Sequence, residues 1–274
     1  MRLIYTLFVL VLLSVPVFSQ PSPASDHADL RFITEHSAIA AGSQTTIGLH
    51  IELEQGWHVY WRNPGDSGIP VRIRWTSEPP FETGEVTWPY PSTFREGHLV
   101  TYGYKDETLI MIPITIPQGT RSGTLLAEAR IEYLVCKEIC LPGFENHTVR
   151  INVPRNNRSV LSTEASLFSA FRSKVPQASR TQSTFTVTGN QVEMLISGDV
   201  SSWNTDQNFV FFASDENQIE SSAPQQIEKT QNGIYLKLTT SRYLNEALET
   251  IKGVVVFGED DSKKAFEIVS FLKR

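Results

Sequence analysis

The chain has 274 residues, and 40% of them are hydrophobic, which is enough to bury a core without disulfide staples and suits two domains of ordinary size. Its 24 Lys and Arg residues against 30 Asp and Glu residues give a net charge of −6. A mildly acidic surface repels phosphates, so we expect no nucleic-acid partner.

The first twenty residues have the pattern of a secretory signal peptide. Arg2 provides a positive start, an apolar run extends from Leu3 to Leu13, and Pro16 precedes the small residue Ser19. A membrane-spanning helix needs about 20 apolar residues, so this run is too short to cross a bilayer comfortably. We expect export with cleavage near Ser19, and an uncleaved anchor is the alternative. An exported cysteine pair can exist as a disulfide.

Residues 21–28 are polar and proline-containing, and we expect them to be a disordered lead-in. After them, apolar and polar residues alternate with a period of two, which is typical of strands with one buried face. Gly- and Pro-rich turn sequences separate these runs. The pattern predicts an all-β fold with a β-sandwich over residues 29–154. The clearest alternating runs are 45–53, 110–116, 125–135 and 147–154.

Residues 155–160 are mostly polar and are our predicted linker to a second β-rich domain over residues 161–274. Near its start, a helix is predicted with Ser162 as its N-cap, Phe168 and Phe171 on one face, and Pro176 after its end. Strand patterns resume after this proline. The second half contains no cysteine and no histidine, so redox or metal chemistry is expected in the first half.

The two cysteines, Cys136 and Cys140, lie in the stretch YLVCKEICLP. A disulfide that closes a loop of about five residues contributes only about 2 kcal/mol, against about 4.7 kcal/mol for a loop of 100 residues. An extended strand would place their Cα atoms about 13 Å apart, whereas a disulfide needs about 4.4–6.8 Å. If the two cysteines form a disulfide, the three residues between them must therefore turn.

The residues alone leave several functions open for this pair. A purely structural disulfide is the simplest. A zinc site could combine the two cysteines with His147 and either His98 or His58, although the paired short spacings of zinc modules are missing. In a cysteine–histidine hydrolase, the nucleophile would oxidise together with the neighbouring thiol in an oxidising compartment. Thiol–disulfide exchange needs one sulfur open to attack and a second that can leave, which a close pair can provide.

Three segments of the first half resemble the periplasmic N-terminal domain of the DsbD and ScsB type of thiol:disulfide interchange proteins. The likeness covers roughly residues 29–154, and the second half is similar to the additional β domain of the ScsB-like branch. The segments are GWHVYWRNPGDSG (56–68), VTWPYPSTFREGHLVTYGYKDETLIMIPITIP (86–117) and EYLVCKEICLP (132–142).

The resemblance implies an immunoglobulin-like sandwich with a reversible disulfide beside a short, aromatic-containing cap loop. By position, Cys140 would form mixed disulfides with partners and Cys136 would resolve them. The aromatic pair of the family's best-known cap is not reproduced in REGHL (95–99). Residues expected to line or cap the site are His58, Tyr60, Arg95, Glu96, Gly97, His98, Tyr102 and Tyr104.

The resemblance also implies a periplasmic electron carrier that needs no cofactor. Its electrons would come from a membrane thiol relay or a thioredoxin-like protein and pass to periplasmic proteins that contain disulfides. The chain carries neither a multi-helix membrane domain nor a CxxC motif, so we expect a separate reductant. The alternative is a non-catalytic β-sandwich binding module with a structural disulfide.

Overall fold

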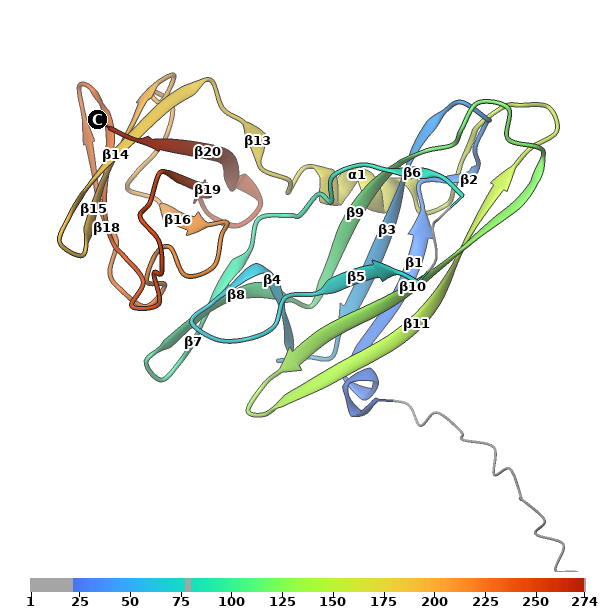
Figure 1. Cartoon of the computed structure of the whole chain (residues 1–274), viewed down its shortest axis with the longest axis horizontal. Helices are drawn as coiled ribbons and strands as arrows, with labels where there is room; N and C mark the ends of the chain where they lie inside the picture. Colours follow the sequence, from blue (N-terminus) through green and yellow to red (C-terminus); the bar gives the residue numbers. More distant parts are fainter. Residues whose placement is uncertain (1–21, 77–79, 274) are drawn as a thin grey trace, which may run out of the picture.

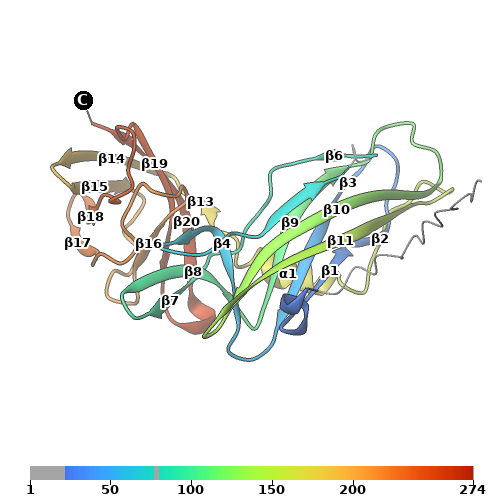
Figure 2. The ribbon, with the colours of Figure 1, turned by 60° about the horizontal axis from the view of Figure 1, so that its bottom comes forward.

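The computed structural model describes residues 22–76 and 80–273, which form many strands and one α-helix (Figure 1). The predicted all-β fold class is confirmed. Two β domains lie side by side in both views, the first coloured blue to yellow and the second gold to red (Figures 1 and 2). The predicted signal peptide, residues 1–20, lies outside the described residues.

The first domain is a sandwich of two antiparallel sheets. Its core is filled by the inward residues of the alternating runs, such as Ile47, Leu49 and Ile110, none of which reaches solvent. The smaller sheet has the order β1-β3-β9-β6, with β1 Ala28–Thr34, β3 Gln44–Leu53, β9 Glu107–Thr115 and β6 Glu82–Thr83. The larger sheet has the order β11-β10-β4-β8-β7, with β11 Cys140–Val153, β10 Gly123–Cys136, β4 His58–Gly65, β8 Leu99–Lys105 and β7 Ser92–Glu96, and β5 Arg72–Trp75 pairs with β10.

The second domain is one eight-stranded sheet that curls around its own core. Its strand order is β16-β19-β20-β14-β15-β18-β17, and β13 also pairs with β20. Pairing is antiparallel except where β13 and β14 meet β20. The bounds are β13 Gln177–Ala178, β14 Thr181–Thr188, β15 Gln191–Gly198, β16 Val210–Ala213, β17 Gln226–Thr230, β18 Gly233–Thr239, β19 Thr250–Phe257 and β20 Lys264–Leu272, with a 3₁₀ turn η2 at Asp260–Ser262.

The helix α1 (Ala165–Arg172) packs on the first domain, although the sequence placed it at the start of the second. Phe168 and Phe171 are buried against Leu109 and Met111 on the outer face of the smaller sheet. Before the helix, the short strand β12 pairs with β2, so the end of the predicted linker is already part of the first domain. Their bounds are β12 Val160–Leu161 and β2 His36–Ala38.

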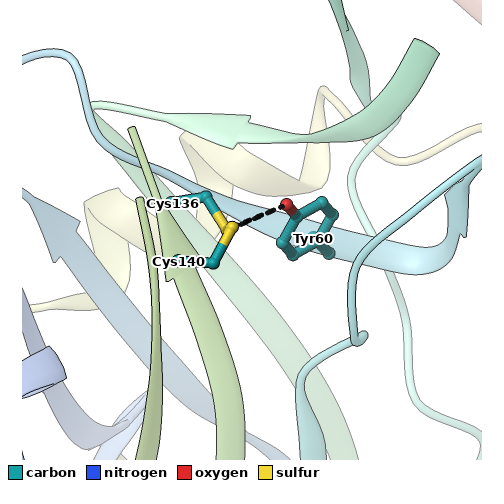
Figure 3. Close-up of a disulfide and its surroundings, with 3 residues drawn as sticks. All are labelled: Tyr60, Cys136 and Cys140. Carbon is teal, nitrogen blue, oxygen red and sulfur yellow. Dashed lines mark hydrogen bonds between the residues drawn. A yellow bond between two sulfur atoms is a disulfide. The ribbon is translucent and has the colours of Figure 1, made fainter. Parts of the chain in front are cut away.

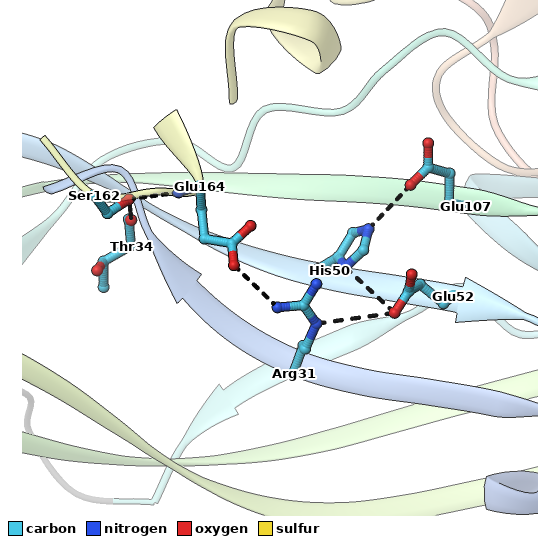
Figure 4. Close-up of polar contacts among 7 residues, drawn as sticks. All are labelled: Arg31, Thr34, His50, Glu52, Glu107, Ser162 and Glu164. Atoms are coloured by element: carbon cyan, nitrogen blue, oxygen red, sulfur yellow. Dashed lines mark hydrogen bonds and ion pairs between the residues drawn. The ribbon is translucent and has the colours of Figure 1, made fainter. Parts of the chain in front are cut away.

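The N-cap of α1 differs from the prediction. The helix begins at Ala165 with Glu164 in the N-cap position, and the hydroxyl of Ser162 accepts the N–H of Glu164 at 3.2 Å while donating to the carbonyl of Thr34 at 2.6 Å (Figure 4). Glu164 also pairs with Arg31 at 3.5 Å. The serine therefore anchors the chain to β1 just before the helix starts.

The lead-in that was expected to be disordered is folded from Ser22 onward. A 3₁₀ turn, η1 (Pro23–Asp26), buries Ala24 completely, and the hydroxyl of Ser22 donates to the carbonyl of Pro142 at 2.7 Å. The composition gave no sign of this because the contact is made with β11, more than a hundred residues away. Residue 21 lies outside the described residues.

The two domains share one stretch of core. Phe212 on β16 of the second domain packs edge-on against Trp61 and Tyr102 of the first domain, with ring centroids 6.3 and 4.9 Å apart. Beside it, the side-chain amide of Asn63 donates to the carbonyl of Ala213 at 2.8 Å. Apolar packing and hydrogen bonds thus fix the second domain to the end of β4.

Within residues 22–76 and 80–273, no helix has the length and apolar character needed to cross a bilayer.

We predict that Phe212→Ala lowers the free energy of unfolding by about 3–5 kcal/mol, because it leaves a cavity where the domains meet. Phe212 is 3% exposed, whereas Phe271 of the same domain is 57% exposed and serves as the control. Phe271→Ala should change the free energy by no more than about 0.5 kcal/mol. Urea unfolding of the full chain measures both, and equal effects would contradict the shared core.

Candidate functional site

The two cysteines close the tip of a long hairpin. Strands β10 and β11 pair in register along fourteen residues each, and the last pair is Cys136 with Cys140. In the turn, the N–H of Lys137 donates to the carbonyl of Ile139 at 3.0 Å. This turn brings the two Cα atoms to 4.1 Å, and the sulfurs form a disulfide (Figure 3).

The two sulfur-bearing residues differ in exposure. Cys136 has no solvent-accessible surface, whereas Cys140 is exposed. The difference follows from the strand order, because β10 lies between β11 and β4 while β11 forms the edge of the sheet. Pro142 is tolerated in this edge strand because its missing N–H is not needed for a ladder on the outer side. Solvent therefore reaches residue Cys140 but not residue Cys136.

Tyr60 on β4 contacts the buried sulfur. Its hydroxyl donates a hydrogen bond to the Sγ of Cys136 at 2.9 Å and lies 3.8 Å from the Sγ of Cys140 (Figure 3). Burial, and secondarily the charge of Glu96, raise the pKa of Tyr60 to about 12. The phenol thus remains a protonated donor at any physiological pH.

Gly68, in the sequence NPGDSG, lies directly against the ring of Tyr60, and its lack of a side chain leaves room for that ring. A Cβ on Gly68 would lie 2.3–2.6 Å from three atoms of that ring, and Gly68 has a φ of +113°. In the same loop, the carboxylate of Asp66 accepts the N–H of Val100 at 2.8 Å, which ties the loop to β8. The first three residues of this sequence, 63–65, end strand β4, and the chain turns at Asp66 and Ser67, which brings Gly68 against the ring of Tyr60.

His58 lies directly opposite Cys136 where β4 pairs with β10. Its ring stacks on Phe94 with centroids 4.4 Å apart and meets the ring of Tyr60 edge-on at 5.2 Å. Burial lowers the pKa of His58, and the negative charge of Glu96 opposes this shift. The imidazole is therefore neutral near pH 7 in the disulfide form.

In the hairpin of β7 and β8, Phe94 covers the ring of His58, and Glu96 acts on His58 through its charge. Glu96 was predicted from the sequence, whereas Phe94 was missed because the aromatic cap was sought in residues 95–99. Phe94 precedes Glu96 by two positions and so shares its face in a strand. That alternation is the signal that could have identified it.

Three predicted site residues lie away from the sulfurs. Tyr102 and Tyr104 alternate with Gly103, which opposes Tyr60, so their side chains point to the other face of the sheet. Tyr104 is buried and donates to the carbonyl of Pro89 at 2.7 Å, and Tyr102 packs on the second domain. His98 is at the exposed tip of the hairpin and lines a cavity of about 300 Å³ between the domains.

The histidine proposed for a zinc site does not meet the cysteines. His147 lies seven residues from Cys140 along β11, about 23 Å in an extended strand, and its Nε2 contacts Glu145 at 2.9 Å.

Elsewhere, His50, Glu52 and Glu107 bring donor atoms within 4.8 Å of one another. The Nε2 of His50 lies 3.3 Å from Glu107 and the guanidinium of Arg31 lies 3.9 Å from Glu52, so both carboxylates already have a partner within the protein (Figure 4).

Comparisons with known proteins bear on this site. The family described as thiol:disulfide interchange protein DsbD, N-terminal, matches residues 29–151. The solved N-terminal periplasmic domain of ScsB from Proteus mirabilis superposes with a TM-score of 0.65 at 17% identity, covering 91% of this chain and 95% of that one. This likeness extends over both domains, and it confirms the fold class with its immunoglobulin-like sandwich.

A protein of unknown function from Porphyromonas gingivalis W83 aligns over 88% of this chain and 99% of its own at 8% identity, but its TM-score of 0.23 supports no argument. A comparison with curated proteins gives no sequence match.

We predict that Gly68→Ala destabilises the protein by about 1–3 kcal/mol more than Gly97→Ala, because its new methyl group would overlap the ring of Tyr60 and its φ of +113° lies outside the left-handed well that Gly97 occupies at +62°. Both glycines have positive φ, but a Cβ on Gly97 would meet no atom within 4 Å. Gly97→Ala therefore reports backbone strain alone, about 1 kcal/mol. Urea unfolding of both variants gives the difference, and equal losses would show that the contact is not tight.

Proposed function

We propose that this protein exchanges disulfides with other proteins outside the cytoplasm, because its residues 29–151 match the family described as thiol:disulfide interchange protein DsbD, N-terminal. The observation that carries the proposal is the asymmetry of the pair, in which Cys140 is exposed and Cys136 is buried under the hydroxyl of Tyr60. A tight disulfide of this kind contributes little to folding, about 2 kcal/mol, so its chemistry is the better reason for its presence.

The exchange begins with a thiolate of a reduced partner. Its sulfur attacks the Sγ of Cys140, a new disulfide forms between the proteins, and the bond between Cys140 and Cys136 breaks. The electron pair of the broken bond remains on Cys136, which leaves as a thiolate. A second thiolate of the partner then attacks the partner's own sulfur in the mixed disulfide, releasing Cys140 and an oxidised partner.

The reduced pair passes the two electrons on by the reverse chemistry. The thiolate of Cys140 attacks the disulfide of an acceptor protein, and the thiolate of Cys136 then attacks Cys140 to release the reduced acceptor. The hydrogen bond from Tyr60 stabilises the buried thiolate at both stages, since hydrogen bonds to an ionised sulfur favour its charged form. All atoms and electrons are supplied by the two proteins, and no cofactor takes part.

We propose a membrane thiol relay or a thioredoxin-like protein as the donor and periplasmic disulfide-containing proteins as acceptors. Exposed apolar side chains on this hairpin suit a protein partner, since Ile139 next to Cys140 is 62% exposed and Phe144, four residues along β11, is 55% exposed. The apolar segment that begins the sequence, and the periplasmic domain named in the ScsB structure, support a periplasmic location.

We predict that the full chain equilibrates with a glutathione buffer at a reduction potential above about −300 mV. In single-cysteine variants, Cys136→Ser should form a mixed disulfide with glutathione at least about tenfold faster than Cys140→Ser, because only Cys140 is accessible. Mass spectrometry of quenched samples measures both rates. A potential far below −300 mV, or equal rates, would favour a structural disulfide in a binding module.

We also predict that Phe144→Ser slows reduction by thioredoxin about tenfold, or ~1.4 kcal/mol, because it removes an exposed apolar side chain four residues from Cys140 along β11. Phe271→Ser is the matched control, since Phe271 is similarly exposed at 57% but lies on the second domain. Reduction by dithiothreitol should be unchanged in both, because a small thiol needs no docking surface. Equal rates with thioredoxin would exclude Phe144 from the docking surface.

A further inference from the structure

His58 is a buried polar group whose surroundings do not satisfy it. Its side chain is 4% exposed, and its Nε2 is a buried atom without a hydrogen-bond partner among the described residues. Phe94 on one side and Tyr60 on another keep water from the ring. An unsatisfied buried polar atom costs about 1–3 kcal/mol. The protein would therefore be more stable with phenylalanine at this position, which indicates that the imidazole has a functional role.

The register of the strands places this imidazole beside the sulfur that leaves. His58 and Cys136 are directly opposite each other in the antiparallel pair of β4 and β10. Residues so paired share a face of the sheet, with Cβ atoms about 4.5–5.5 Å apart. The same sulfur accepts the hydrogen bond from Tyr60. A neutral phenol donates a hydrogen bond but supplies no positive charge.

The charged and titratable groups around His58 come from four strands. Tyr60 shares β4, Glu96 comes from β7, Lys105 lies opposite His58 on β8, and Cys136 comes from β10. Burial lowers the pKa of His58, and the negative charge of Glu96 opposes this by favouring the protonated imidazole. Lys105 is exposed, and water screens its charge. A second negative charge at Cys136 would therefore favour the imidazolium form.

We propose that His58 takes up a proton when the disulfide opens and becomes the counter-charge of the Cys136 thiolate. This inference rests on the proposed function, since it concerns the same exchange. In the first step the electron pair of the broken S–S bond stays on Cys136, and a proton from water binds the imidazole. When the thiolate of Cys136 attacks again to re-form the disulfide, the partner leaves as a thiolate and His58 returns its proton to water.

The decisive measurement is the protonation state of His58 in the full-length wild-type chain, followed by the NMR shifts of its imidazole in the oxidised and the reduced form. We expect a neutral ring near pH 7 in the oxidised form and a protonated ring in the reduced form. The same state in both forms would overturn the proposal. This experiment needs no variant, so a misfolded substitution cannot obscure it.

Variants give a second test. We expect reduced wild type to show the ultraviolet absorbance of one thiolate at pH 7, and His58→Gln to lose it. The variant should also be about tenfold harder to reduce in glutathione buffer, a shift of ~30 mV to a lower potential. His98→Gln is the control, because His98 is exposed at the hairpin tip. Unchanged absorbance and potential in His58→Gln would contradict the role of His58.

The two levels of the proposal fail separately. If Cys140 forms no mixed disulfide, the exchange function itself is wrong. If exchange proceeds and His58 stays neutral throughout, only the role of His58 is wrong, and Tyr60 alone stabilises the thiolate.

Discussion

Strand β4 is the constraint on which the site depends, because a strand turns successive side chains to opposite faces. His58 and Tyr60 face the sulfurs, while Val59 and Trp61, which alternate with them, are buried in the core. Asn63, near the end of the same strand, is bonded to the second domain. The groups at the disulfide therefore cannot shift without disturbing the core and the domain contact, and the fold holds them ready before a partner arrives.

The chemistry of the pair follows from placing one sulfur at a sheet edge and the other inside the sheet. The edge gives access to Cys140, whereas the interior would make an unassisted thiolate on Cys136 costly, since burial disfavours charge. Tyr60 offsets part of this cost without adding a charge of its own, so the disulfide form carries no unpaired ion. Pairing in the register of β10 and β11, and not a large loop, brings the sulfurs together.

Sequence patterns predicted the features that depend on neighbouring residues alone. The alternation of apolar and polar residues located the strands. The Cα separation in an extended strand is too long for a disulfide, so the segment between the cysteines had to turn for one to form. The groups that complete the site were harder to find, because each depends on a contact between distant segments. Phe94 is a site residue because its strand folds over His58, and Gly68 matters because the ring of Tyr60 lies against it. The position of α1 was also beyond the pattern, since an amphipathic face does not specify which sheet it will cover.

The domain boundary predicted from the sequence, at residues 155–160, differs from the boundary in the structure, because β12 and α1 still pack on the first domain. A fragment ending at Val153, where the family match stops within two residues, would lack α1 and Phe212. Trp61 and Tyr102 would then lose the contact with Phe212, and the outer face of β9 would no longer be covered by α1. Such a fragment would expose apolar surface in two places and would be prone to associate. In this chain, the disulfide-bearing domain therefore depends on α1 and on the second domain to cover its apolar surface.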